Sequence, residues 1–162
     1  MLCRAILAFV ALPGIVAFAI PLVIAAWMQS LSVQNPLGLI ILVPGLLLLL
    51  WCVREFHVAG QGTLAPWTPP KYLVVTGPYR YCRNPMYVGV DLILLGWAAL
   101  YRSALLLLYA AGVAVAFHLR VVLAEEPWAA QRFGQGWSDY RARTPRWLPR
   151  KYHGREDRRP DL

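Results

Sequence analysis

Residues 76–87, TGPYRYCRNPMY, combine arginine, tyrosine and proline side chains directly before a long apolar segment, and we call this stretch the collar. Asn84 is a preferred N-cap and Pro85 is favoured at the first helical position, so a helix is predicted to begin there. A helix N-terminus presents free N–H groups and a partial positive charge, to which Arg80 and Arg83 add full charges. The collar is therefore expected to bind an anionic group, such as a phosphate, a carboxylate or the amino-acid end of a cofactor.

Glu125 and Glu126 form a second group with possible chemistry, at the end of the last apolar segment. A helix C-terminus disfavours anions, so this pair needs a cationic partner, which could be Arg120, a collar arginine or a cationic ligand. Helical spacing places His118 on the face of Glu125, so we expect Glu125 rather than Glu126 to point into the bundle. The expected inward stripe comprises Ala111, Ala114, His118, Val122 and Glu125. Two alternatives stay open, namely solvated acids at a helix end and a purely structural hydrogen bond of His118.

The composition indicates a membrane protein, because 59% of the residues are hydrophobic and 15% are charged, against about 25% charged residues in soluble domains. Four apolar segments are long enough, or nearly so, to cross a hydrocarbon core of ~30 Å: residues 5–28, 37–53, 84–101 and 103–123. The first is longer than the ~7–15 apolar residues of a removable signal peptide. The predicted fold class is all-α, a polytopic membrane protein whose last two helices form a tight hairpin.

Prolines and glycines inside the apolar segments have an expected packing role. Pro13, Pro21 and Pro44 should bend the first two helices, with neighbouring helices bonding the freed backbone groups. Gly89 and Gly96 are seven residues apart in the sequence and share a helix face that allows close contact.

The distribution of positive charge predicts the topology. With a cytoplasmic N-terminus, the links 29–36 and 101–103 face outward and contain one cation, Arg102. This positive-inside pattern places both termini and the collar in the cytoplasm, and it explains the net charge of +8 without nucleic-acid binding. A cysteine at position 34 should react from outside and one at position 66 should not. The cationic tail is expected to touch anionic membrane lipids.

The polar regions flank the last two apolar segments. Residues 57–84 form a long loop punctuated by glycine and proline, and loops of this length are usually functional or disordered. Residues 129–150 read as a short amphipathic helix followed by an extended aromatic segment, both expected to cap the site. The three cysteines have no metal-ligand spacing, so no metal site is expected.

Two blocks carry a family resemblance. GQGTLAPWTPPKYLVVTGPYRYCRNPMYVGV, followed by AEEPWAAQRFGQGWSDYRARTPRWLPR, resembles the isoprenylcysteine carboxyl methyltransferase family, with its related phospholipid N-methyltransferases. The resemblance implies an integral membrane methyltransferase that uses S-adenosylmethionine, with a lipophilic acceptor entering from the bilayer. The resemblance covers about residues 55–150, which are the expected cofactor-binding part of a single membrane-embedded domain over residues 1–150. Residues 151–162 are rich in charge and are expected to form a disordered tail.

The resemblance assigns residues to the cofactor. The family's Arg-His-Pro element matches Arg83, Asn84 and Pro85, with asparagine in place of histidine, and its next tyrosine matches Tyr87. Its glutamate pair matches Glu125 and Glu126, and its late tyrosine and basic residue match Tyr140 and Arg143. In chemical terms, carboxylates suit the cofactor's ammonium or ribose diol, and the collar suits its carboxylate. Tyrosines, Tyr79 among them, can pack on the adenine and face the sulfonium.

The acceptor could be an isoprenylcysteine-type carboxylate or a lipid amine. Arg120 is the candidate for holding an anionic acceptor, whereas His118 would act as a proton acceptor for an amine or hydroxyl. Two other functions stay open. One is an NADPH-dependent membrane reductase, for which Arg141, Arg143 and Arg146 could bind a 2′-phosphate. The other is a non-catalytic membrane scaffold or lipid-binding protein.

Overall fold

The computed structural model describes residues 10–28, 32–60 and 71–148. In these ranges the regular structure is entirely helical, which confirms the all-α class. η1 and η3 are π-helical and η2 is a single 3₁₀ turn. Position 66 and the predicted tail 151–162 lie outside the described residues. The elements in chain order are η1 (Val10–Ala19), α2 (Ile20–Trp27), α3 (Gly38–Val58), η2 (Gly77–Arg80), α4 (Pro85–Leu100), α5 (Ala104–Arg120), η3 (Val121–Glu125), α6 (Glu126–Phe133) and α7 (Gln135–Arg143).

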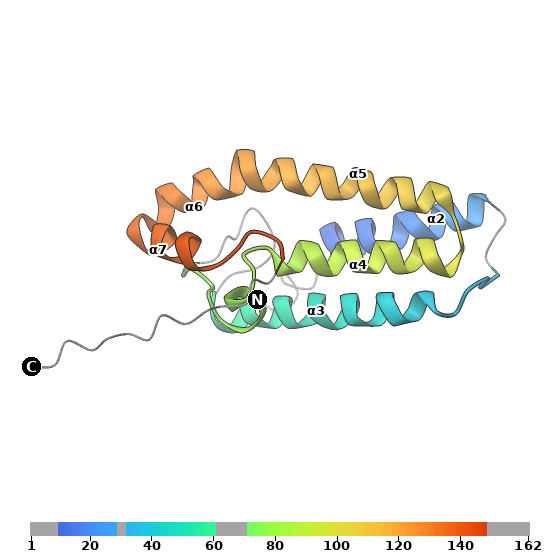
Figure 1. Ribbon diagram of the computed structural model, residues 1–162, viewed down its shortest axis with the longest axis horizontal. Coiled ribbons are helices and arrows are strands. Elements are labelled where there is room, and N and C mark those ends of the chain that lie inside the picture. Colours follow the sequence, from blue (N-terminus) through green and yellow to red (C-terminus); the bar gives the residue numbers. More distant parts are fainter. Residues whose placement is uncertain (1–9, 29–31, 61–70, 149–162) are drawn as a thin grey trace, which may run out of the picture.

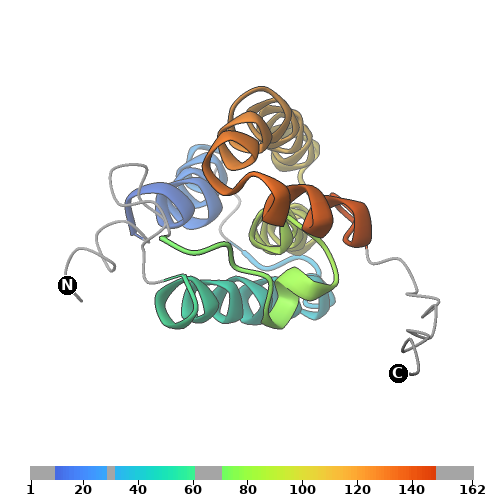
Figure 2. The same cartoon turned by 90° about the vertical axis from the view of Figure 1, so that its left-hand side faces the viewer.

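The helix α4 lies in the middle of the bundle (Figure 1, Figure 2). It contacts α3, α5 and η1, while α2 continues from η1 and contacts α5. The short helices α6 and α7 lie at the end of the bundle where α4 begins, as Figure 1 shows. A turn at Gly134, with a φ of 52°, separates them, so the single amphipathic helix predicted after residue 129 is wrong. The collar, the end of α5 and the helices α6 and α7 therefore lie at the same end of the bundle.

Two described helices are long and apolar enough to cross a membrane. They are Gly38–Val58, with a mean hydropathy of 2.1, and the continuous run Ala104–Phe133, with a mean hydropathy of 2.0. Pro13–Trp27 and Pro85–Leu100 are shorter apolar helices. Large apolar side chains remain exposed on the outer faces of both candidate spans, for example Ile40, Leu47, Leu108 and Val115. Four spans with cytoplasmic termini stay a prediction.

Glycines bring α3 and α4 into close contact. A Cβ built at Gly96 would lie 2.5 Å from the Cβ of Leu42 on α3, and one at Gly38 would lie 2.5 Å from the backbone nitrogen of Leu100 on α4. Gly45 and Gly89 meet similarly, each with the other's carbonyl oxygen near the Cβ position. The predicted small-residue face at positions 89 and 96 is thus confirmed, and its partner carries glycines at the same spacing of seven.

The backbone break at Pro21 is compensated from neighbouring helices. Proline has no N–H, so Pro21 cannot bond to the carbonyls four and five residues earlier, those of Ala17 and Val16. The indole of Trp97 on α4 donates to Ala17 O at 2.9 Å, and the hydroxyl of Tyr109 on α5 donates to Val16 O at 3.1 Å. Such repair matters most in an apolar environment, where an unpaired carbonyl finds no water.

The collar is fixed to α3 on one side and leads into α4 on the other. Thr76 Oγ1 donates to Glu55 Oε2 at 2.7 Å, and Gly77, with a φ of 57°, leaves no room for a Cβ beside the Glu55 side chain. The helix α4 begins at Pro85 as predicted. The Asn84 side chain does not cap the helix; it donates instead to the carbonyl of Arg146, at 3.1 Å. The asparagine therefore joins the collar to the segment that follows α7.

Candidate active site

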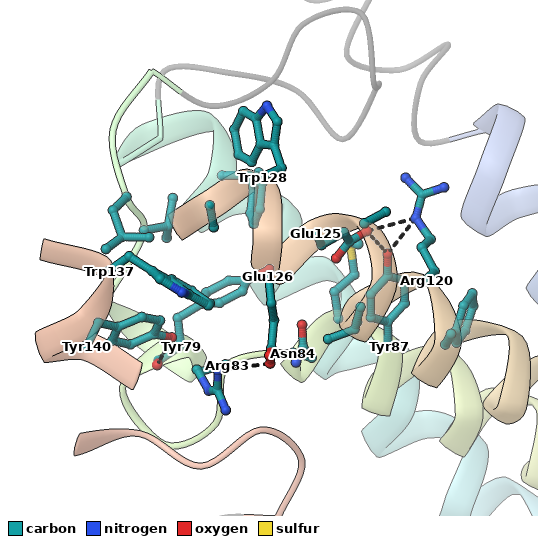
Figure 3. Close-up of a pocket in the computed structure, with 18 of the residues that line it drawn as sticks. Tyr79, Arg83, Asn84, Tyr87, Arg120, Glu125, Glu126, Trp128, Trp137 and Tyr140 are labelled. Carbon is teal, nitrogen blue, oxygen red and sulfur yellow. Dashed lines mark hydrogen bonds and ion pairs between the residues drawn. The ribbon is translucent and has the colours of Figure 1, made fainter. Parts of the chain in front are cut away.

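A cavity of ≈ 500 Å³ opens where the collar, the end of α5, α6 and α7 meet (Figure 3). This volume lies within the ~300–1,000 Å³ typical of small-molecule sites. One end of the cavity is polar and aromatic, with Tyr79, Arg83, Glu126 and Trp137. The lining also includes apolar side chains from the bundle, which are Pro13, Val16, Met86, Val90 and Phe117. A single ligand site here can therefore receive both polar and apolar groups.

Glu126 is held by two arginines from distant parts of the chain. Arg83 Nη1 donates to Glu126 Oε1 at 2.9 Å, while Arg146 donates through Nε to Oε1 at 2.7 Å and through Nη2 to Oε2 at 2.9 Å. The side chains of Arg83 and Glu126 are 8% and 10% exposed. Burial lowers the pKa of Arg83, and the adjacent Glu126 carboxylate opposes that shift. We call these three residues the Glu126 cluster.

A second hydrogen-bonded group joins Tyr87 on α4, Arg120 at the end of α5 and Glu125 on η3. The hydroxyl of Tyr87 donates to Glu125 Oε1, and Arg120 Nε donates to the same carboxylate oxygen at 2.8 Å and to Tyr87 Oη at 3.2 Å. The Tyr87 ring packs on Phe117, with 4.3 Å between the ring centroids. The Arg120 and Glu125 side chains are 51% and 36% exposed, so this pair is far more accessible than the Glu126 cluster.

Aromatic residues join α7 to the collar. The hydroxyl of Tyr140 donates to the carbonyl of Tyr79 at 2.6 Å, and the Arg83 guanidinium lies 5.5 Å from the centre of the Trp137 ring. The ring of Phe56, on α3, lies 5.4 Å from that of Tyr79. Burial raises the pKa of both Tyr79 and Tyr140, so both hydroxyls keep their protons at neutral pH.

Three hydrogen-bond donors in the cavity wall lack a partner among the described residues. They are Tyr79 Oη, Arg83 Nε and Trp137 Nε1, all buried. The polar neighbour of Tyr79 Oη is the thiol of Cys52, a weak partner. Buried donors are normally satisfied, and these three belong to residues that line the cavity, although the donor atoms themselves are almost inaccessible. A ligand with hydrogen-bond acceptors would reach them only after these side chains shift toward the cavity.

The π turn η3 changes which glutamate points inward. Leu106 and Ala110 on α5 and Val121 at the start of η3 are buried, whereas His118 is exposed, so the predicted inward stripe is wrong. A π turn contains an extra residue, which rotates the following side chains by about 100° relative to a continuous α-helix. Glu126 consequently becomes the buried glutamate, and the expectation that Glu125 points further into the bundle is corrected.

Most of the predicted site residues meet at the cavity. The lining includes Tyr79, Arg83, Asn84, Tyr87, Arg120, Glu125, Glu126 and Tyr140. Three predicted residues do not line it. Pro85 is buried at the start of α4, Arg143 is exposed on α7, and exposed His118 accepts a hydrogen bond at Nδ1 from Trp147 Nε1, at 3.3 Å. Among the described residues, therefore, no histidine lines this cavity as a proton acceptor.

Sequence reasoning missed several cavity residues. Trp128 and Trp137 line the cavity, and Arg146 supplies two of the three hydrogen bonds to Glu126. Arg146 had a detectable signal, because a pair of acids at a helix end required cations and the tail is rich in arginine. The tryptophans had a weaker signal, since aromatic residues at a membrane interface often serve only as anchors.

Comparisons with known proteins identify the family. The family model of phospholipid methyltransferases matches residues 33–136. The nickel-cobalt-cadmium resistance protein NccN of Alcaligenes xylosoxydans xylosoxydans is 34% identical over 104 residues, which cover 62% of this chain and 43% of that protein. The cobalt-zinc-cadmium resistance protein CzcN of Cupriavidus metallidurans is also 34% identical over 104 residues, covering 62% of this chain and 42% of that protein.

The chain thus spans about two fifths of the length of these curated relatives. No solved structure matches it. The matched segment extends from the link before α3 to the start of α7, so it includes the collar, the glutamate pair and most of the cavity wall. The chain belongs to the phospholipid methyltransferase family, within the isoprenylcysteine carboxyl methyltransferase-like group.

Proposed function

We propose that the chain transfers a methyl group from S-adenosylmethionine to a lipophilic acceptor at the cytoplasmic membrane interface. The observation that carries this proposal is the cavity itself, which joins unpartnered donors, aromatic rings and ion pairs to an apolar region reaching η1. Membership of a methyltransferase family supports it, because S-adenosylmethionine is the usual methyl donor of such enzymes.

The polar end of the cavity fits S-adenosylmethionine. Its carboxylate, ribose oxygens and adenine nitrogens are acceptors, as the unpartnered donors of Tyr79, Arg83 and Trp137 require. Glu125 bonds to its neighbours through Oε1, which leaves Oε2 for the ammonium group or the ribose diol. The ring of Trp137 can attract the positive sulfur. When bound, the cofactor supplies an electrophilic methyl group on this sulfonium.

The apolar part of the cavity suits the acceptor. Pro13 and Val16 from η1, together with Val90 and Phe117, line the cavity and would offer apolar surface to an acyl or prenyl chain. Arg120 uses Nε for Glu125 and Tyr87, and its terminal nitrogens bond to no described residue. They are placed to hold a carboxylate acceptor, whereas an amine acceptor would instead be attracted to Glu125.

Methyl transfer to a carboxylate needs no proton transfer, so the chain's main tasks are alignment of the reactants and exclusion of water. Alignment falls to the Tyr87–Glu125–Arg120 group on one side and the Glu126 cluster on the other. Exclusion of water falls to the aromatic residues of α6 and α7, Trp128, Phe133, Trp137 and Tyr140.

The test combines binding with product identification. Isothermal titration of S-adenosylmethionine into the purified, detergent-solubilised protein should show saturable binding, and excess NADPH should not compete. Tyr79→Phe removes only the unpartnered hydroxyl, so it should weaken cofactor binding about 2- to 12-fold, the equivalent of one neutral hydrogen bond of ~0.5–1.5 kcal/mol. Folding stability should not fall. The matched control is Tyr81→Phe, an exposed collar tyrosine outside the cavity.

Incubation with radiolabelled S-adenosylmethionine and a total lipid extract should then yield a labelled lipophilic product. Displacement by NADPH, or binding without any labelled product from lipids of several sources, would contradict the proposal. The first result would favour a reductase, and the second would favour a non-catalytic lipid-binding role.

A further inference from the structure

A second cavity, of ≈ 290 Å³, shares Glu126 with the first. Its remaining lining consists of two arginines, Arg141 and Arg146, and of Val122, Pro127 and Ala130. Arg141 is on α7 and Arg146 is in the segment that follows it, while the apolar residues come from η3 and α6. The cavity therefore offers guanidinium groups beside a hydrocarbon surface.

The charges around this second cavity do not balance. Three guanidinium groups, those of Arg83, Arg141 and Arg146, act on the single Glu126 carboxylate, which leaves an excess of two positive charges. Both Glu126 oxygens already accept hydrogen bonds from Arg83 and Arg146. Arg141 forms no hydrogen bond or ion pair with any described residue, and Arg146 has Nη1 uncommitted within the same part of the chain. An anion would correct this imbalance.

The position of the cavity along the chain indicates the source of that anion. It lies where the apolar run Ala104–Phe133 turns polar. The side chains of Leu119 and Leu123, just before and beside it, are 50% and 72% exposed, as expected for residues that face lipid. A charged cavity one turn beyond such a surface lies at the depth of the lipid headgroups.

We propose that this cavity binds the phosphate group of an anionic phospholipid through Arg141 and Arg146. Guanidinium groups suit phosphate because their planar N–H pairs match its oxygens. Val122, Pro127 and Ala130 provide an apolar wall for the glycerol and the first acyl carbons. This site depends on the membrane placement of α5 and not on the methyl-transfer reaction, so it can hold or fail independently of the proposed function.

The test uses short-chain probes on the purified full chain in neutral detergent. Dihexanoyl phosphatidylglycerol is titrated by calorimetry. Glycerophosphoglycerol serves as the soluble anion, because it carries the same singly charged phosphodiester without the acyl chains. Arg141→Gln should weaken phosphatidylglycerol binding about tenfold or more, the loss of one charge-assisted contact. Arg132→Gln, which removes the same charge from an exposed α6 residue outside both cavities, should leave binding within about twofold.

Circular dichroism should show both variants folded, because neither arginine bonds to a described residue. Equal weakening in both variants would mean general charge attraction and would overturn the site, as would unchanged binding in Arg141→Gln. Glycerophosphoglycerol binding as tightly as the lipid would overturn the lipid assignment and make this a site for soluble phosphate esters.

Discussion

Replacing Glu126 with glutamine should lower the free energy of unfolding, and not only weaken ligand binding at the site. Glutamine keeps the size of the side chain but removes its charge, and its amide NH₂ would face an arginine donor. Arg83, whose side chain is 8% exposed, would then be a buried cation without its counter-charge. Breaking a buried pair in this way typically costs about 3–5 kcal/mol, most of it the penalty for the stranded charge. Arg146, at 29% exposure, can turn to solvent and adds less.

The neighbouring residue provides an internal control. Glu125 bonds to Arg120, and both side chains are substantially exposed, at 36% and 51%, so Glu125→Gln should cost only about 0–1 kcal/mol. The free energy of unfolding of each variant is measured by titrating the protein in mixed micelles with SDS. Equal losses of stability in the two variants would refute the reasoning. So would a Glu126→Gln protein of normal stability, because the buried Arg83 would then tolerate the loss of its counter-charge.

Three further predictions can be checked with the same preparation. Gly96→Ala should lower the free energy of unfolding by about 1–3 kcal/mol because its Cβ collides with α3, whereas Gly112→Ala, with nothing within 4 Å, should not lower it. Trp97→Phe removes the donor to Ala17 O and should cost about 1–3 kcal/mol in the same SDS titration, while unchanged stability would show that the carbonyl finds another partner. In a background without the native cysteines, Gln34→Cys should react with an impermeant maleimide in intact cells, and protection until lysis would reverse the topology.

Features that depend on local chemistry were predictable from the sequence. The start of α4 at Pro85 follows from a strong helix-start signal, and the packing face at Gly89 and Gly96 follows from their spacing. The need to repair the backbone at Pro21 was also predictable, because proline always removes a donor. The donors themselves, Trp97 and Tyr109, are about 80 and 90 residues away along the chain, and only tertiary packing selects them.

The orientation of the glutamate pair could not be predicted from helical periodicity. A stripe drawn at 3.6 residues per turn assumes uniform winding, and η3 breaks that assumption between Val121 and Glu125. The stripe also failed before this turn, because the inward face of α5 carries Leu106, Ala110 and Phe117, whereas Ala111 and His118 are exposed. The predicted stripe was chosen for its polar residues, whereas the buried face is apolar.

The Glu126 cluster also constrains the order in which the protein can be assembled. Its three members come from the collar, the start of α6 and the segment that follows α7. Arg83 and Glu126 are 43 positions apart in the sequence, and Glu126 and Arg146 are 20 positions apart. Until Arg146 has been synthesised and has left the ribosome, the Glu126 carboxylate has only Arg83 as a partner. A chain shortened within α7 keeps Arg83 and Glu126 but lacks Arg146, so it loses two of the three hydrogen bonds to this carboxylate. The segment that follows α7 therefore completes the ion pairs beside the cavity after every described helix has been made.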